Sequence, residues 1–164
     1  MTERTSEIPE SRSEVALLAP QERFFLWGMR IWMRGHWTGK PVDGILRKGF
    51  AGIYAVDALP AFGALMQAVT AFWLRPLDIT CACRQFVTGD EVYLLDLIRL
   101  AHEREPDHFP LRLLDSCFRP DARAVLQCHL YEFLRELDFA ITSSCRPMKP
   151  SPARYHFPVQ PSVH

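Results

Sequence analysis

Apolar residues recur at helical spacing through most of the chain, which favours an all-α fold. Between residues 20 and 34, a broad apolar face at about 100° per residue comprises Phe24, Phe25, Gly28, Met29, Trp32 and Met33. Pro20 suits the first position of this helix, and Gly35 is expected to end it. A second helix is predicted from Pro41 to about Val56.

The third predicted helix, at about 60–74, is apolar nearly all round, so we expect it to pack at the centre of the fold. Its uncharged run contains a proline and polar residues, and a buried helix fits it better than a membrane span. Three glycines in the first two helices would let helices approach one another closely, namely Gly28, Gly49 and Gly52.

The fourth helix has the clearest start. Thr88 and Glu91 form a predicted capping box, in which each side chain satisfies a backbone N–H of the other residue. This helix is expected to continue to about Glu103, and a short helix follows at 111–118. A last helix is predicted from Pro120 to about residue 141. The segment at 77–87 has no helical period, and its alternating pattern suggests an extended segment or a short strand.

These patterns predict a single-domain all-α bundle of five to six helices around a central apolar helix. A disordered arm is expected at 1–14, the helical domain at 15–142, and a proline-rich disordered tail at 143–164. The length of 164 residues, 48% of them hydrophobic and 23% charged, suits one globular domain.

The formal net charge is zero, but its distribution along the chain is uneven. Residues 23–48 contain six Lys/Arg and one Asp, whereas residues 76–145 contain twelve Asp/Glu and seven Arg. This split indicates either pairing within the molecule or an anionic partner on one face. The candidate contacts for a nucleic acid or an anionic membrane surface are Arg23, Arg30, Arg34, Arg47 and Lys48.

Cys81 and Cys83 are the only closely spaced pair among five cysteines. The polar N-terminus and the odd count favour a reducing cytoplasm with free thiols. Three interpretations of the pair remain open: ordinary packed residues, two ligands of a zinc or iron ion, or a redox pair. A metal would need further ligands, for which the candidates are Cys117, Cys128, Cys145, His36, His102, His108 and His129.

Three short motifs lie on separate predicted elements: Leu26-Trp27-Gly28-Met29-Arg30, Arg75-Pro76-Leu77-Asp78 and Gly89-Asp90-Glu91. Together they resemble a family of small helical alphaproteobacterial proteins of uncharacterised function, over about residues 18–104. The resemblance implies a cytoplasmic helical protein and brings no activity with it.

The sequence assembles no set of catalytic residues. We therefore expect a non-enzymatic cytoplasmic protein-interaction or regulatory module that binds a protein partner or forms a homodimer. One alternative is a thiol-based metal-binding or redox-sensing protein centred on Cys81 and Cys83. A second alternative is peripheral binding of nucleic acid or anionic membrane through the basic N-terminal helices.

Overall fold

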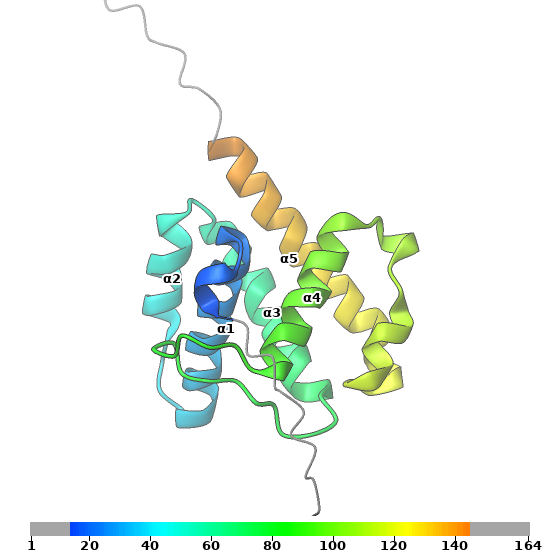
Figure 1. The fold of residues 1–164 in the computed structure, drawn as a ribbon. Coiled ribbons are helices and arrows are strands. Elements are labelled where there is room, and N and C mark those ends of the chain that lie inside the picture. The colour runs from blue at the N-terminus through cyan, green and yellow to red at the C-terminus, as the bar shows by residue number, and fades with distance from the viewer. Residues whose placement is uncertain (1–13, 145–164) are drawn as a thin grey trace, which may run out of the picture.

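Helix α3 (Leu59–Phe72) lies at the centre of the structure, with the other helices packed around it (Figure 1). The computed structural model describes residues 14–144, and in that range the chain is all-α with no β-strand. The other α-helices are α1 (Pro20–Thr38), α2 (Asp43–Gly52), α4 (Gly89–Glu103) and α5 (Arg123–Ser144). Short 3-10 helices are η1 (Val15–Leu17), η2 (Val56–Ala58), η3 (Pro106–His108), η4 (Leu111–Ser116) and η5 (Pro120–Ala122).

The predicted all-α bundle with a central apolar helix is confirmed. Four phenylalanine rings, from α1, α2, α3 and α5, form a connected cluster at its middle: Phe25, Phe50, Phe62 and Phe133. The ring centroids of Phe50 and Phe62 lie 5.3 Å apart, and those of Phe62 and Phe133 lie 5.6 Å apart. Such contacts add to the hydrophobic stabilisation of the buried rings themselves.

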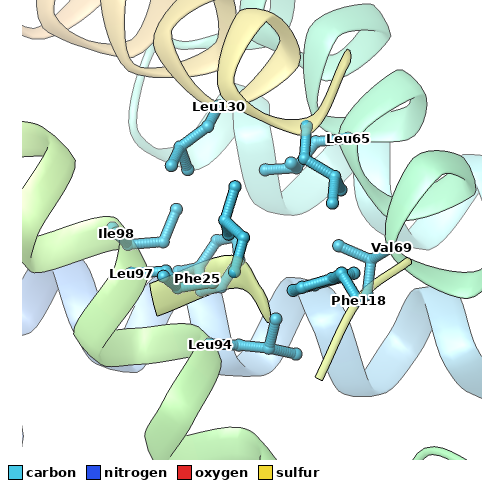
Figure 2. A pocket seen from close by; sticks show the side chains of 10 residues that line it. Phe25, Leu65, Val69, Leu94, Leu97, Ile98, Phe118 and Leu130 are labelled. Atoms are coloured by element: carbon cyan, nitrogen blue, oxygen red, sulfur yellow. The ribbon is translucent and has the colours of Figure 1, made fainter. Parts of the chain in front are cut away.

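The interior is closely packed on the α4 side of α3 as well. A cavity of about 20 Å³ lies among apolar side chains from α1, α3, α4 and α5, including Phe25, Leu65, Leu97 and Leu130 (Figure 2). This volume is close to that of a single water-sized probe. The cavity is therefore a packing defect and is too small for a ligand.

Two of the three glycines bring helices together as expected. A Cβ atom on Gly49 of α2 would lie 2.0 Å from Cη2 of Trp27 in α1. A Cβ atom on Gly28 would lie 3.2 Å from Cζ of Phe62 in α3. Gly52 has no such neighbour within 4 Å, so the expectation was wrong there.

Helix α1 is longer than predicted, and α2 is shorter. Gly35 lies inside α1, where it faces Val42. The helix ends at Thr38 and is capped by Gly39, whose φ of 65° is left-handed. Helix α2 ends at Gly52 instead of about Val56. Tyr54 follows with a φ of 59°, which an α-helix does not accommodate. The predicted arm and tail lie outside the described residues, except for Glu14 and residues 143–144.

The segment between α3 and α4 is an irregular loop, at residues 73–88, and the suggested strand is absent. Only isolated bridges occur at its two ends, Trp73 with Phe118 and Glu14 with Phe86. No helix within residues 14–144 combines the length and hydropathy that a bilayer crossing requires.

Candidate functional site

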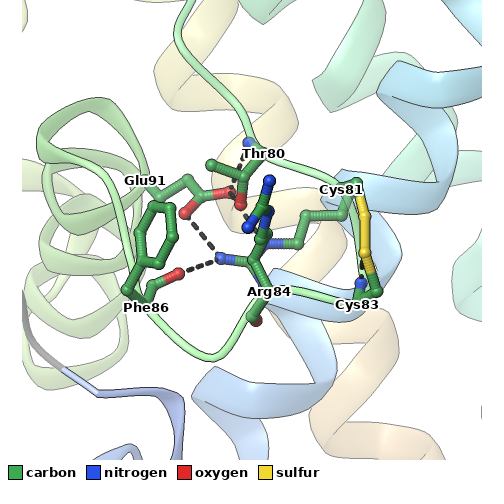
Figure 3. Close-up of a disulfide and its surroundings, with 7 residues drawn as sticks. Thr80, Cys81, Cys83, Arg84, Phe86 and Glu91 are labelled. Atoms are coloured by element: carbon green, nitrogen blue, oxygen red, sulfur yellow. Dashed lines mark hydrogen bonds and ion pairs between the residues drawn. A yellow bond between two sulfur atoms is a disulfide. The ribbon is translucent and has the colours of Figure 1, made fainter.

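Cys81 and Cys83 form a disulfide in the loop between α3 and α4, with Ala82 as the single intervening residue (Figure 3). All three residues are exposed to solvent. The expectation of free thiols was therefore wrong for this pair, and so was the interpretation of the two cysteines as packed residues. Of the three interpretations, only the redox pair includes a disulfide, and its redox activity stays a prediction.

Backbone groups converge on Cys81 and close a tight turn. The N–H of Cys83 donates to Sγ of Cys81 at 3.3 Å, and the N–H of Arg84 donates to the carbonyl oxygen of Cys81 at 3.1 Å. A backbone N–H directed at a sulfur favours that sulfur as a thiolate when the disulfide opens. The two sulfurs are therefore chemically unequal, and Cys81 is the better leaving group.

A buried ion pair between α1 and α4 lies next to this turn and is bonded to the residues that flank it. Nε and Nη2 of Arg30 donate to Oε1 and Oε2 of Glu91, each at 2.8 Å. The side chains of Arg30 and Glu91 are 3% and 0% exposed. This bidentate geometry is the strongest form of an arginine–carboxylate pair. Arg30 is therefore an interior residue, and its assignment as a surface contact for an anionic partner was wrong.

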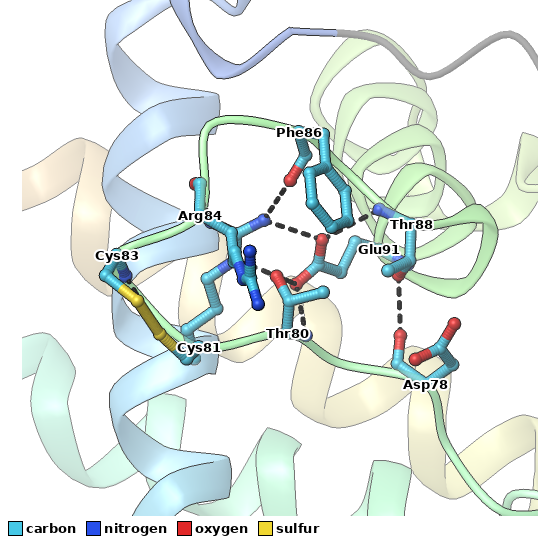
Figure 4. A network of polar contacts seen from close by, with 9 residues as sticks. Asp78, Thr80, Cys81, Cys83, Arg84, Phe86, Thr88 and Glu91 are labelled. Carbon is cyan, nitrogen blue, oxygen red and sulfur yellow. Dashed lines mark hydrogen bonds and ion pairs between the residues drawn. A yellow bond between two sulfur atoms is a disulfide. The ribbon is translucent and has the colours of Figure 1, made fainter.

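The remaining hydrogen bonds of this pair hold the loop on both sides of the disulfide. Before it, the N–H of Thr80 donates to Oε1 of Glu91 at 3.0 Å. After it, Nη1 of Arg30 donates to the carbonyl oxygen of Arg84 at 2.8 Å, and Nη2 donates to that of Phe86 at 2.7 Å. Figure 4 shows Thr80 and Thr88 on either side of the Glu91 carboxylate.

Thr88 and Glu91 also form the predicted capping box of α4. The N–H of Thr88 donates to Oε2 of Glu91 at 2.9 Å, and the N–H of Glu91 donates to Oγ1 of Thr88 at 3.3 Å. The sequence therefore identified one role of Glu91 and missed the other. A capping glutamate is ordinarily at the surface, whereas this one is completely enclosed.

A second ion pair fixes the part of the loop that follows α3. Arg75 donates to both carboxylate oxygens of Asp90, which also accepts the N–H of Asp78 at 2.8 Å. Hydrogen bonding to Asp90 and its negative charge raise the pKa of Arg75 above its ordinary value. The two adjacent acidic residues at the start of α4 thus hold different parts of one loop.

The three motifs of the family resemblance meet in these contacts. Arg30 comes from the first motif, Arg75 and Asp78 from the second, and Asp90 and Glu91 from the third. Comparison of the chain with protein-family models, curated proteins and solved structures finds no match. The resemblance therefore stays a prediction.

Among the residues that the structure describes, no further metal ligands come to the cysteine pair. Within residues 14–144, no group of three or more Cys, His, Asp or Glu side chains is placed to hold a metal ion. Cys117 is half-buried beside Ser116, Cys128 is exposed on α5, and Cys145 lies outside the described residues. The disulfide also occupies both sulfurs that would ligate zinc or iron.

The other four predicted anion contacts lie at the surface of α1 and α2. Arg23, Arg34, Arg47 and Lys48 are all exposed. In the described part of the chain none of these four residues forms an ion pair. The arginines that do form ion pairs there lie outside α1 and α2, except for Arg30. The basic charge of α1 and α2, apart from Arg30, is therefore not neutralised by internal ion pairs.

Replacing Glu91 with Gln is expected to destabilise the fold by about 3–5 kcal/mol, because it leaves the Arg30 guanidinium buried without a counter-charge. The matched control is Arg99→Gln, which removes the pairs of Arg99 (49% exposed) with Glu22 and Asp96. Exposed pairs contribute about 0–1 kcal/mol. Urea unfolding followed by circular dichroism measures both variants. Equal losses in the two would contradict the importance of the buried pair.

Proposed function

We propose that this protein is a redox-responsive regulatory module, in which Cys81 and Cys83 interconvert between a disulfide and a dithiol. The observation that supports this most directly is the exposed Cys81–Cys83 disulfide on a loop bonded to a buried ion pair. An exposed disulfide is accessible to an attacking thiolate, which is a requirement for exchange.

The size of the disulfide-closed loop favours a chemical role over a stabilising one. A disulfide restricts the unfolded chain more when the loop it closes is longer. For a loop of three residues the chain-entropy relation gives roughly 1.6 kcal/mol at 25 °C, against about 3 kcal/mol for fifteen residues. The Cys81–Cys83 bond therefore stabilises the fold about half as much as a disulfide that closes a fifteen-residue loop, and the fold already has a large apolar core.

Thiol–disulfide exchange would reduce the Cys81–Cys83 bond in two steps. A thiolate from a small thiol such as glutathione attacks Sγ of Cys83, the S–S bond breaks, and Cys81 leaves as a thiolate beside the N–H of Cys83. A second thiol, deprotonated, then attacks the mixed disulfide and releases Cys83 as a thiolate. The two external thiols end as one disulfide, and the two protons that they released on ionisation protonate the Cys81 and Cys83 thiolates. The protein thereby gains two electrons and two protons.

The regulatory part of the proposal rests on what else the loop contacts. The N–H of Val15 donates to the carbonyl oxygen of Gln85 at 2.8 Å, two residues beyond Cys83. Val15 begins η1, whose Leu17 is 81% exposed. A conformational change at the cysteine turn would therefore act on η1 through this hydrogen bond and shift the exposed side chain of Leu17. In this proposal Leu17 contacts a protein partner or a second copy of the chain. Under the cytoplasmic location that we propose, disulfides are transient and suit sensing.

Glutathione redox buffers test the proposed function. We expect the full-length protein to populate both the Cys81–Cys83 disulfide and the dithiol, and to return to the starting ratio when the buffer is reversed. Alkylation followed by mass spectrometry of the peptide carrying both cysteines measures the two forms. Cys81→Ser is the control, because it can form only a mixed disulfide at Cys83. A pair that stays fully reduced or fully oxidised in every buffer would overturn the proposal.

A second candidate function is binding of a phosphate-bearing partner, either nucleic acid or an anionic membrane surface. It is favoured by the four exposed cations of α1 and α2 that lack ion pairs in the described structure. Exposed Trp37 and Ile45 lie on the same two helices and would add apolar contacts with lipid.

Reversing two of these charges, in Arg47→Glu/Lys48→Glu, is expected to weaken retention on an anionic matrix strongly. A plot of the logarithm of the binding constant against the logarithm of the salt concentration becomes less steep by about one unit for each phosphate contact that is lost. Binding to duplex DNA and to vesicles containing phosphatidylserine distinguishes the two partners. Arg104→Glu/Arg112→Glu is the matched control, because it makes the same charge change outside α1 and α2. Equal effects of both pairs would show that only net charge matters.

A further inference from the structure

The Arg30–Glu91 pair bonds to the loop immediately before and after the disulfide. Thr80 precedes Cys81 by one residue, and Arg84 follows Cys83 by one residue. Thr80 donates its N–H to Glu91 at 3.0 Å, and Arg84 accepts from Arg30 at 2.8 Å. Because Arg30 and Glu91 are fixed to each other and buried, these two bonds limit how far the ends of the cysteine turn can separate.

The disulfide needs its ends held at a defined separation. The Cα atoms of Cys81 and Cys83 lie 5.4 Å apart, within the range that a disulfide bridges. In a free loop, forming the disulfide would also order the backbone of residues 80–84. The conformational entropy lost when the backbone of one residue is fixed lowers the equilibrium constant for disulfide formation about tenfold. A loop that is already bonded at both ends has less freedom to lose.

We infer that Arg30 and Glu91 are positioning residues for the Cys81–Cys83 redox couple, which they shift toward the disulfide by holding both flanks of the cysteine turn. This inference rests on the proposed function, because it concerns the same thiol–disulfide equilibrium. It adds the residues that set the equilibrium, which lie on α1 and α4 outside the loop itself. Thermodynamic linkage makes the effect reciprocal, so closing the disulfide strengthens the bonds of the buried pair to the loop.

The pair acts through geometry, because its two charges cancel. Nearby charge alone would also change a thiol equilibrium, since a cation favours thiolates and an anion disfavours them. Glu91→Gln leaves a cation in place, and Arg30→Gln leaves an anion. A charge effect therefore moves the two variants in opposite directions. Loss of positioning moves both toward the dithiol. Arg30→Gln removes the bonds to the carbonyl oxygens of Arg84 and Phe86. Glu91→Gln leaves one acceptor oxygen where the N–H groups of Thr80 and Thr88 use two.

The experiment measures the equilibrium constant for oxidation of Cys81 and Cys83 in glutathione buffers, using the full chain. The variants are Glu91→Gln, Arg30→Gln and the double variant Arg30→Met/Glu91→Leu. The double variant guards against unfolding, because replacing a buried pair with apolar residues is often neutral for stability. Far-UV circular dichroism verifies the fold. The control is Arg75→Gln, which breaks the pair with Asp90 at the same helix start but makes no bond to residues 80–86.

We expect the equilibrium constant to fall about tenfold in all three variants and to stay unchanged in Arg75→Gln. For a two-electron couple, a tenfold change corresponds to about 30 mV. A folded double variant with the wild-type constant would overturn the inference while leaving the proposed function intact. Opposite shifts in the two single variants would replace positioning with a charge effect. A wild-type chain that does not interconvert would instead refute the proposed function.

Discussion

The buried pair between Arg30 and Glu91 is the interaction on which the functional region depends. It joins α1 to α4 across 61 positions of sequence and uses its remaining hydrogen-bonding capacity on the loop between α3 and α4. Removing two charges from water opposes folding, and the attraction within the pair offsets this only when the surrounding lone pairs and protons are also satisfied. Here they are satisfied by backbone groups of the loop. The loop conformation and the ion pair therefore stabilise each other.

This arrangement explains how an irregular loop presents a defined chemical group. Residues 73–88 contain no helix or strand of their own, and loops without regular structure ordinarily have many conformations. Asp90 holds the first part through Arg75 and Asp78, and Glu91 with Arg30 holds the part around the cysteines. The disulfide is thus exposed on a scaffold that is fixed to the core. Under the proposed redox function, a chemical change at the sulfurs would therefore act on defined neighbours of the loop.

The fold was largely predictable from the sequence, because it follows from local patterns. Apolar spacing located the five α-helices, and Thr88 with Glu91 located the start of α4. The end of α1 was misplaced because Gly35 is needed for contact with Val42, and the turn uses Gly39 instead. Periodicity reports which face of a helix is buried, but it does not report which glycine the tertiary contacts require.

The site was predictable only in part, because its central contact is long-range. The close spacing of Cys81 and Cys83 identified them as candidate residues. Their exposure and their disulfide, however, depend on the long-range hydrogen bonds that hold the loop. Arg30 was assigned to the candidate anion contacts together with Arg23 and Arg34, which share its side of α1 at helical spacing. One signal in the sequence pointed the other way: apolar Leu26 and Met33 lie at helical spacing on either side of Arg30. Both are buried in the structure. A charged residue between two such positions requires a partner, and no local rule indicates that the partner is Glu91.

Amide hydrogen exchange at Thr80, measured by NMR, tests the central claim most directly, because that N–H has Glu91 as its acceptor. We expect slow exchange at Thr80 and Thr88 in the native chain, and fast exchange at both in Arg30→Met/Glu91→Leu, while amides within α3 keep their protection. Unchanged protection of Thr80 in that variant would show that the loop is held by something other than the buried pair, and would contradict the role that we assign to Arg30 and Glu91.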